Sequence, residues 1–306
     1  MCCIVCKAWL PRCRLHLWAR ITLRGHQELR TFSRLLSKYR DFGNHVVELT
    51  LDLTGSRWQS FPLILVDKLP KVQQICSRNQ SVNDDDQGPP LHPQHLTALS
   101  SFRSLSTWIV SGLSFQTMAS FIRMCAAFPR LECLHCCGTK WRISTGPSLP
   151  LYQATLVTSL HISDTILPSM SSLWYMLAAL PSLNRLICEF VTWDGEEHIS
   201  IVPSPMASLQ IHELSIRDID VSSQFVDMLL AVIDPLALDT FRAFPREIDQ
   251  LRHCARVCDA AGPSLRHLFL GDTSKSSFKA SGHTGRHHYS YLIHSYKRIH
   301  NRQTIS

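Results

Sequence analysis

A repeated apolar-x-x-apolar pattern constrains this chain more than any other feature of its sequence. It occurs nine times, and the first residues of successive copies are 26, 33, 26, 26, 26, 28, 27 and 27 positions apart. The copies begin at Val46, Val72, Leu105, Leu131, Val157, Leu183, Ile211, Leu238 and Leu265. The one long interval contains the run NDDDQGPP at 83–90, whose composition is typical of a solvated loop. This near-constant phase predicts a stack of similar units; the alternative is chance leucine spacing in an ordinary α/β domain.

Each copy has the alternation of a short β-strand. In most units a further apolar residue follows two places after the second apolar position, as Leu51, Val110 and Ile162 do. Successive side chains of a strand point to opposite faces of the sheet. The pattern therefore predicts short strands, each with one buried face.

Amphipathic stretches between the copies predict helices. One is Phe115–Cys125 behind a candidate N-cap at Ser114, another follows a candidate N-cap at Ser222, and a third spans Ile248–Val257. Regular alternation of strand and helix predicts an α/β fold with a parallel sheet. Because the units repeat, we expect a curved solenoid with its helices on the outer side.

This organisation resembles the leucine-rich repeat, in which a strand and a helix recur every roughly 20–29 residues. The resemblance covers 25–270 as about nine units, although the asparagine that usually follows the strand is mostly absent. It implies a degenerate leucine-rich-repeat solenoid whose concave face is the binding surface.

The first residues resemble the C-terminal half of an F-box. The segments that carry the resemblance are VCKAW at 5–9 and LWARI at 17–21. Together with the repeats they resemble an F-box/leucine-rich-repeat protein of the fungal type, with a partial F-box-like helical segment at 1–24. In that family the F-box docks on the Skp adaptor of a cullin–RING ubiquitin ligase, and the repeats hold the substrate. The resemblance thus implies adaptor contacts at Val5, Trp9, Leu17, Trp18 and Ile21.

The F-box resemblance is incomplete at its beginning. The L-P-x-E-[IL] helix that opens an F-box is absent, so we expect an N-terminally truncated motif whose adaptor binding is weak or lost. The alternative role of Trp9, Leu17 and Trp18 is a hydrophobic cap on the first repeat, because solenoids need capping at their ends.

The excess of positive charge lies at the two ends of the chain. Residues 1–40 carry a net +8 and residues 271–306 a net +5, which leaves −6 for residues 41–270. A nucleic-acid-binding protein carries its basic patch on the folded body, so nucleic acid is not an expected partner. We expect residues 271–306 to be a flexible, basic tail rich in histidine and serine.

Composition predicts a globular, intracellular protein. Apolar residues make up 45% of the chain and charged residues 18%, and no apolar run approaches the roughly 18 residues that cross a bilayer. The N-terminus lacks the pattern of a signal peptide. We therefore expect a cytoplasmic or nuclear protein without a membrane partner, with its 12 cysteines as thiols.

No motif in the sequence indicates an enzyme. A nucleophile elbow, a phosphate-binding loop, a dinucleotide fingerprint and a zinc-protease motif are all missing. Zinc could be considered at the CLHCC run of 133–137 and at the CCxxC run of 2–6, but neither is accompanied by the second ligand pair of a tetrahedral site. We expect no catalytic residue, no cofactor and no metal.

The outward positions of the strands are the remaining candidate site. They form two rows of mixed apolar, polar and charged character, which favours a protein partner over a phosphate backbone. The expected substrate contacts are Cys133, His135, Ser159, His161, Arg185, Ile187, Glu213, Ser215 and Arg242. The expected function is therefore non-enzymatic substrate recognition for a Skp–cullin–F-box ligase. The alternative is a leucine-rich-repeat scaffold, or a truncated nonfunctional copy, without a ligase connection.

Overall fold

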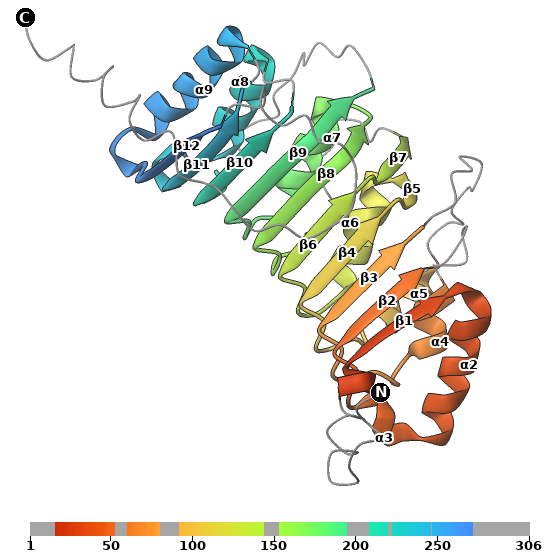
Figure 1. The fold of residues 1–306 in the computed structure, drawn as a ribbon. Helices are drawn as coiled ribbons and strands as arrows, with labels where there is room; N and C mark the ends of the chain where they lie inside the picture. Colours follow the sequence, from red (N-terminus) through yellow and green to blue (C-terminus); the bar gives the residue numbers. More distant parts are fainter. Residues whose placement is uncertain are drawn as a thin grey trace, which may run out of the picture.

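The computed structural model describes residues 16–52, 60–79, 92–143, 153–194, 208–219, 222–245 and 247–271. A parallel sheet of 12 strands runs through them in the order β1-β2-β3-β4-β6-β8-β9-β10-β11-β12, with β5 paired to β7 and β7 to β8 (Figure 1). The strands are β1 (Arg20–Arg24), β2 (Glu48–Asp52), β3 (Gln74–Arg78), β4 (Thr107–Ser111), β5 (Ser114–Thr117), β6 (Cys133–Cys137), β7 (Lys140–Ile143), β8 (Ser159–Leu167), β9 (Arg185–Trp193), β10 (Glu213–Arg217), β11 (Thr240–Phe244) and β12 (His267–Leu270).

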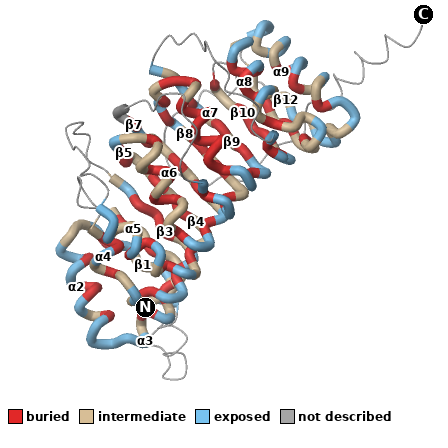
Figure 2. The backbone as a smooth tube through the Cα atoms, turned by 180° about the vertical axis from the view of Figure 1, so that it is seen from behind, coloured by how far each residue is buried: buried red, intermediate tan, exposed pale blue. Residues whose placement is uncertain are grey.

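Helices connect the strands and cover one face of the sheet. They lie behind the strands in Figure 1 and in front of them in Figure 2, so the opposite face of the sheet carries no helix of the described chain. The helices are α2 (Gly25–Lys38), α3 (Arg40–Gly43), α4 (Phe61–Leu65), α5 (Pro93–Leu99), α6 (Met118–Ala127), α7 (Met170–Ala178), α8 (Ser223–Val232) and α9 (Ile248–Ala261), with short 3-10 turns at Pro235–Ala237 and Gly262–Ser264. The expected α/β architecture with a parallel sheet and outer helices is confirmed.

One row of apolar side chains runs the length of the sheet on the helix side. Strand pairing places the second apolar residue of each unit directly beside its equivalent in the next unit. The members of this row that are at most 1% exposed are Leu49, Ile75, Trp108, Leu134, Leu160, Leu186, Leu214 and Phe241. A single unit cannot bury this side chain alone, so the row couples each unit to its neighbours.

The first strand of the sheet lies in the segment expected to be helical. Residues 20–24 form β1, which pairs in parallel with β2, so the expected helical segment at 1–24 is corrected there. The register places Trp18 and Ile21 at the two apolar positions of a tenth unit, 28 residues before Val46 and Leu49. The sequence contains this signal, because the spacing of 28 falls within the range of the other units.

Helix α6 begins later than the sequence indicated. Ser114 lies in β5 and is not the N-cap; Thr117 caps α6 instead, because its hydroxyl accepts a hydrogen bond from the Ser120 N–H. The other two helices predicted from amphipathic patterns are confirmed as α8, capped by Ser222, and α9.

A left-handed backbone position recurs at the same place in five consecutive units, after the five paired strand residues; in β8 and β9 the strand continues beyond it. It is occupied by Gly112, Gly138, Asp164, Phe190 and Asp218, which have φ values of 65°, 58°, 49°, 53° and 51°. The turn is secured across units, since the Gly112 N–H donates to the Cys137 carbonyl at 2.8 Å and the Gly138 N–H to the Ser163 carbonyl at 2.9 Å. Only glycine adopts this region without a steric penalty, and asparagine and aspartate tolerate it better than other residues.

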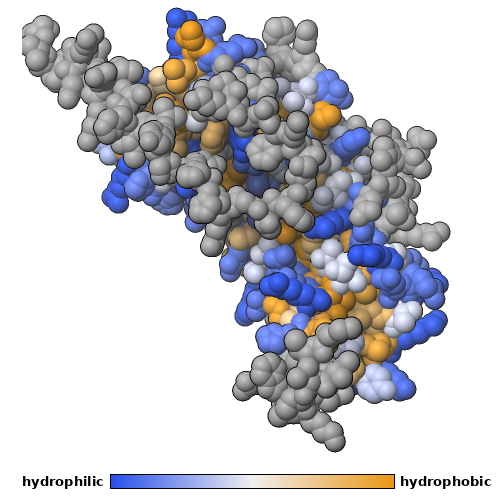
Figure 3. All heavy atoms as spheres, in the orientation of Figure 1, coloured by the Kyte–Doolittle hydropathy of each residue, from blue (hydrophilic) through white to orange (hydrophobic). Residues whose placement is uncertain are grey.

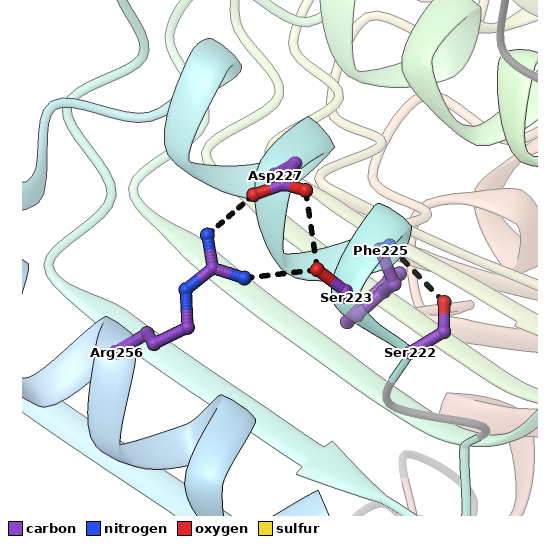
Figure 4. A network of polar contacts seen from close by, with 5 residues as sticks. All are labelled: Ser222, Ser223, Phe225, Asp227 and Arg256. Atoms are coloured by element: carbon purple, nitrogen blue, oxygen red, sulfur yellow. Dashed lines mark hydrogen bonds and ion pairs between the residues drawn. The ribbon is translucent and has the colours of Figure 1, made fainter.

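Helices α8 and α9 are joined by a polar cluster at the N-terminus of α8 (Figure 4). The Ser222 hydroxyl accepts a hydrogen bond from the Phe225 N–H at 3.2 Å. From α9, Arg256 donates to the Ser223 hydroxyl at 3.1 Å and pairs with Asp227. Because the ionic contacts are exposed to solvent, the cap is expected to contribute more to stability than the ion pair.

Replacing Ser222 by alanine is therefore expected to lower the free energy of unfolding by about 1 kcal/mol, since the Phe225 N–H would lose its partner. Urea denaturation of the variant beside the wild type measures the change. The adjacent Ser223→Ala is the matched control, because it keeps the cap and removes only exposed contacts to Arg256 and Asp227. A larger loss for Ser223→Ala than for Ser222→Ala would contradict this assignment.

Candidate functional site

The open face of the sheet gathers all nine expected substrate contacts. They lie on five adjacent strands, β6, β8, β9, β10 and β11, in two rows that run across the strands in register. Arg185 is exposed, Ser215 is buried with 5% of its surface exposed, and the others are partly exposed. Where described atoms are visible on this face, hydrophilic and hydrophobic side chains are interspersed (Figure 3).

A third row on the same face was missed by the sequence analysis. Strand pairing continues for two more residues beyond the expected rows and aligns Cys137, Ser163, Glu189, Arg217 and Phe244. The same period of two would have identified these positions had the alternation been followed to the end of each strand. Glu189, Arg217 and Phe244 of this row make ion-pair or cation–π contacts on the face.

A shared carboxylate links three neighbouring strands. Glu213 on β10 accepts from Arg185 on β9, with Nε and Oε2 separated by 3.0 Å. Its other oxygen lies 2.8 Å from Nη1 of Arg242 on β11. The guanidinium groups are more exposed than the carboxylate, at 45% and 40% of the side-chain surface against 23%. This part of the face therefore presents its cations outward.

A histidine pair occupies the centre of the face. The rings of His135 and His161 lie 5.3 Å apart, and His161 Nε2 lies 3.4 Å from Oε2 of Glu189. The contact with His161 lowers the pKa of the Glu189 carboxyl; burial opposes this effect, and the charges on His161 and Arg217 add to it. Burial lowers the pKa of His135, and the charges of His161 and Arg185 add to the effect. His135 is thus mainly neutral at neutral pH, while Glu189 is ionised.

Arginine side chains alternate with phenylalanine rings towards the last strands. The guanidinium carbon of Arg217 lies 5.5 Å from the ring centre of Phe190 and 5.4 Å from that of Phe244. Arg242 lies 5.3 Å from the ring of Phe269 in the same way. These distances are those of cation–π contacts, which hold a guanidinium plane in a fixed orientation.

Two buried thiols on the helix side of the strands, Cys136 and Cys188, are poor candidates for chemistry. Burial raises the pKa of the Cys188 thiol to about 12 and raises that of Cys136 as well. A reactive cysteine needs a lowered pKa, so these two thiols act as packing residues. Among the residues that the structure describes, no group of three or more histidine, cysteine, aspartate or glutamate side chains is arranged to hold a metal ion.

The five expected adaptor contacts are not brought together as one described surface. Val5 and Trp9 lie outside the described residues. Leu17 is 63% exposed, whereas Trp18 stacks on Phe42 with the ring centres 4.7 Å apart. Ile21 lies in β1 beside Leu49 and packs against the core. Trp18 and Ile21 therefore close the first end of the described sheet.

No family model and no curated protein matches this chain. Within the described ranges, no helix combines the length and the apolar character that a membrane span requires.

Proposed function

We propose that this chain is a leucine-rich-repeat protein without enzymatic activity that binds a partner protein through the open face of its sheet. The observation that carries the proposal is the face itself, where partly exposed apolar, neutral polar and paired charged side chains stand in register over at least five strands. Such mixed composition suits a protein epitope, whereas a phosphate backbone requires an excess of cations. Repeat proteins commonly bind on extended surfaces of this kind.

Within this proposal the chain is the substrate-recognition subunit of a Skp–cullin–F-box ubiquitin ligase in the cytoplasm or nucleus. The support for the ligase connection is the resemblance of residues 5–21 to an F-box. The eight cysteines that the structure describes are free thiols, as a reducing compartment requires. The alternative is a repeat scaffold with no ligase connection, which the packing of Trp18 and Ile21 within the sheet end favours.

Titration against a purified Skp adaptor separates these two functions. We expect the 306-residue chain to bind the adaptor weakly or not at all, because Trp18 and Ile21 already pack against the body of the protein. A chimera with a complete F-box placed before residue 16 is expected to bind, since adaptor affinity depends on a few well-packed anchor residues. Isothermal titration calorimetry of both proteins measures the difference.

A matched control keeps the result interpretable. The same chimera with the anchor tryptophan of the added F-box replaced by alanine should lose binding, which shows that the F-box itself makes the contact. Equal, tight binding by the 306-residue chain and by the chimera would contradict the expectation and assign adaptor recruitment to residues 1–24.

A further inference from the structure

Phe190 departs from the pattern of its position. In the other four units that share its left-handed backbone conformation, the residue is glycine or aspartate, at 112, 138, 164 and 218. A bulky aromatic residue with φ of 53° is strained, and such strain persists where the surrounding structure holds it in place. The Phe190 side chain is only partly buried in compensation, because 41% of its surface is exposed. Packing alone therefore does not account for a phenylalanine at this position.

The exposed ring of Phe190 forms one side of an arginine clamp. Arg217 lies between Phe190 on β9 and Phe244 on β11, at 5.5 and 5.4 Å from the two ring centres. Its Nε is buried and makes no hydrogen bond within the described part of the chain, with Oδ2 of Asp218 at 3.5 Å. A guanidinium fixed between two rings is pre-organised for planar, bidentate contact with a carboxylate.

Arg185 and Arg242 are more exposed than the carboxylate they share, whereas Arg217 is about as exposed as Glu189. Glu213 is shared between Arg185 and Arg242, Glu189 is paired with His161, and Asp218 has only 5% of its side chain exposed. Glu213 thus neutralises part of the charge of Arg185 and Arg242 and leaves both guanidinium groups more exposed than itself, while 26% of the Arg217 side chain remains exposed. The strands β4 and β6 present no charged side chain in the two rows expected to bind substrate, which separates the cationic cluster of β9–β12 from Arg20 and Arg78 on β1 and β3.

We propose that the cluster of Phe190, Arg217, Arg242, Phe244 and Phe269 is the main contact site for the partner, and that it binds an extended acidic segment of a protein. This inference rests on the proposed function and specifies the partner chemistry of the same face. Arginine and aromatic side chains dominate binding energy at protein interfaces. A carboxylate of the partner segment would bind the guanidinium groups. An apolar side chain next to that carboxylate in the segment would pack on the exposed rings of Phe190 and Phe269.

Selection from a random 12-residue peptide library displayed on phage tests the proposal. The immobilised 306-residue chain is expected to enrich peptides that carry aspartate or glutamate next to an apolar residue. Fluorescence titration of an enriched peptide then measures its Kd for the wild type and for the variants. Phe190→Gly and Arg217→Gln are each expected to weaken binding at least tenfold. Replacing the acidic residue of the peptide by its amide should have a similar effect.

Two features make the variants informative. Phe190→Gly should fold at least as stably as the wild type, because glycine relieves the left-handed strain; Phe190→Asn is a second variant of the same kind. Thr50→Ala, on the same face at β2, is the control that should leave the peptide Kd unchanged.

Several outcomes would overturn the inference. They are the enrichment of no peptide, the enrichment of peptides without acidic residues, and unchanged binding by Phe190→Gly and Arg217→Gln. Binding of a single-stranded dT20 oligonucleotide at least as tightly as the peptide would mark the cluster as a phosphate site and would also overturn it. If instead enriched peptides lose affinity only with variants at β6 and β8, the proposed function stands while this inference fails. The adaptor titration is independent of all these results.

Discussion

Replacing Leu160 by alanine is expected to lower the free energy of unfolding by about 2–5 kcal/mol. Leu160 is fully buried and stands between Leu134 and Leu186 in the continuous row behind the sheet. Its truncation removes apolar burial and leaves a cavity that the stacked strands on both sides cannot close without losing their register. Because each unit is stabilised mainly by its neighbours, the substitution weakens the contacts of this unit with the units on both sides.

Urea denaturation followed by circular dichroism measures this change. Leu156→Ala is the matched control, because the same atoms are removed from a side chain that is 51% exposed, and we expect a change within about 0.5 kcal/mol. A loss below about 1 kcal/mol for Leu160→Ala would mean that the row does not couple the units as the register indicates.

The second large effect is expected at a turn. Gly112→Ala should lower the free energy of unfolding by about 2–5 kcal/mol, from about 1–2 kcal/mol of left-handed strain and about 1–3 kcal/mol of steric overlap. A Cβ at this position would lie 2.5 Å from the backbone oxygen of Asn79 in the neighbouring unit. Backbone in a stacked sheet cannot move aside as a flexible side chain can.

Gly138→Ala separates the two contributions. It has the same left-handed conformation, with φ of 58°, but its added Cβ would have no neighbour closer than 3.8 Å. We expect Gly138→Ala to lower the free energy of unfolding only by the left-handed strain, about 1–2 kcal/mol. Equal losses for the two variants, measured by the same denaturation, would show that the contact with Asn79 relaxes freely.

Much of the fold follows from the phase of the repeat. Alternation at nine positions was sufficient to predict which side chains lie behind the sheet, such as Leu134 and Leu186, and which lie on the open face, such as His135 and Arg185. The reason is geometric: side chains of a strand alternate between faces, and a constant spacing puts equivalent positions in register.

Local signals misled the prediction at both the N-terminal end and helix α6. The segment from Trp18 to Leu23 has the alternation of a further unit, yet its likeness to an F-box favoured a helix; residues 16–19 are helical, but pairing with β2 makes 20–24 a strand. Ser114 precedes an apolar stretch as an N-cap would, but pairing of β5 with β7 keeps residues 114–117 extended. In both cases hydrogen bonds to a distant strand outweigh local preference.

In the candidate site, the rows of side chains could be predicted from the repeat spacing, whereas the contacts between side chains of different units could not. The periodicity of the sequence determines the rows of the open face, including the third row, because these depend on spacing alone. The clamp of Phe190, Arg217 and Phe244 depends on units stacked side by side, since its members are 27 residues apart in the chain. The strained φ of Phe190 also depends on its neighbours: a phenylalanine avoids this conformation locally, and the pairing of Glu189 and Val191 with β8 on either side of it holds it there.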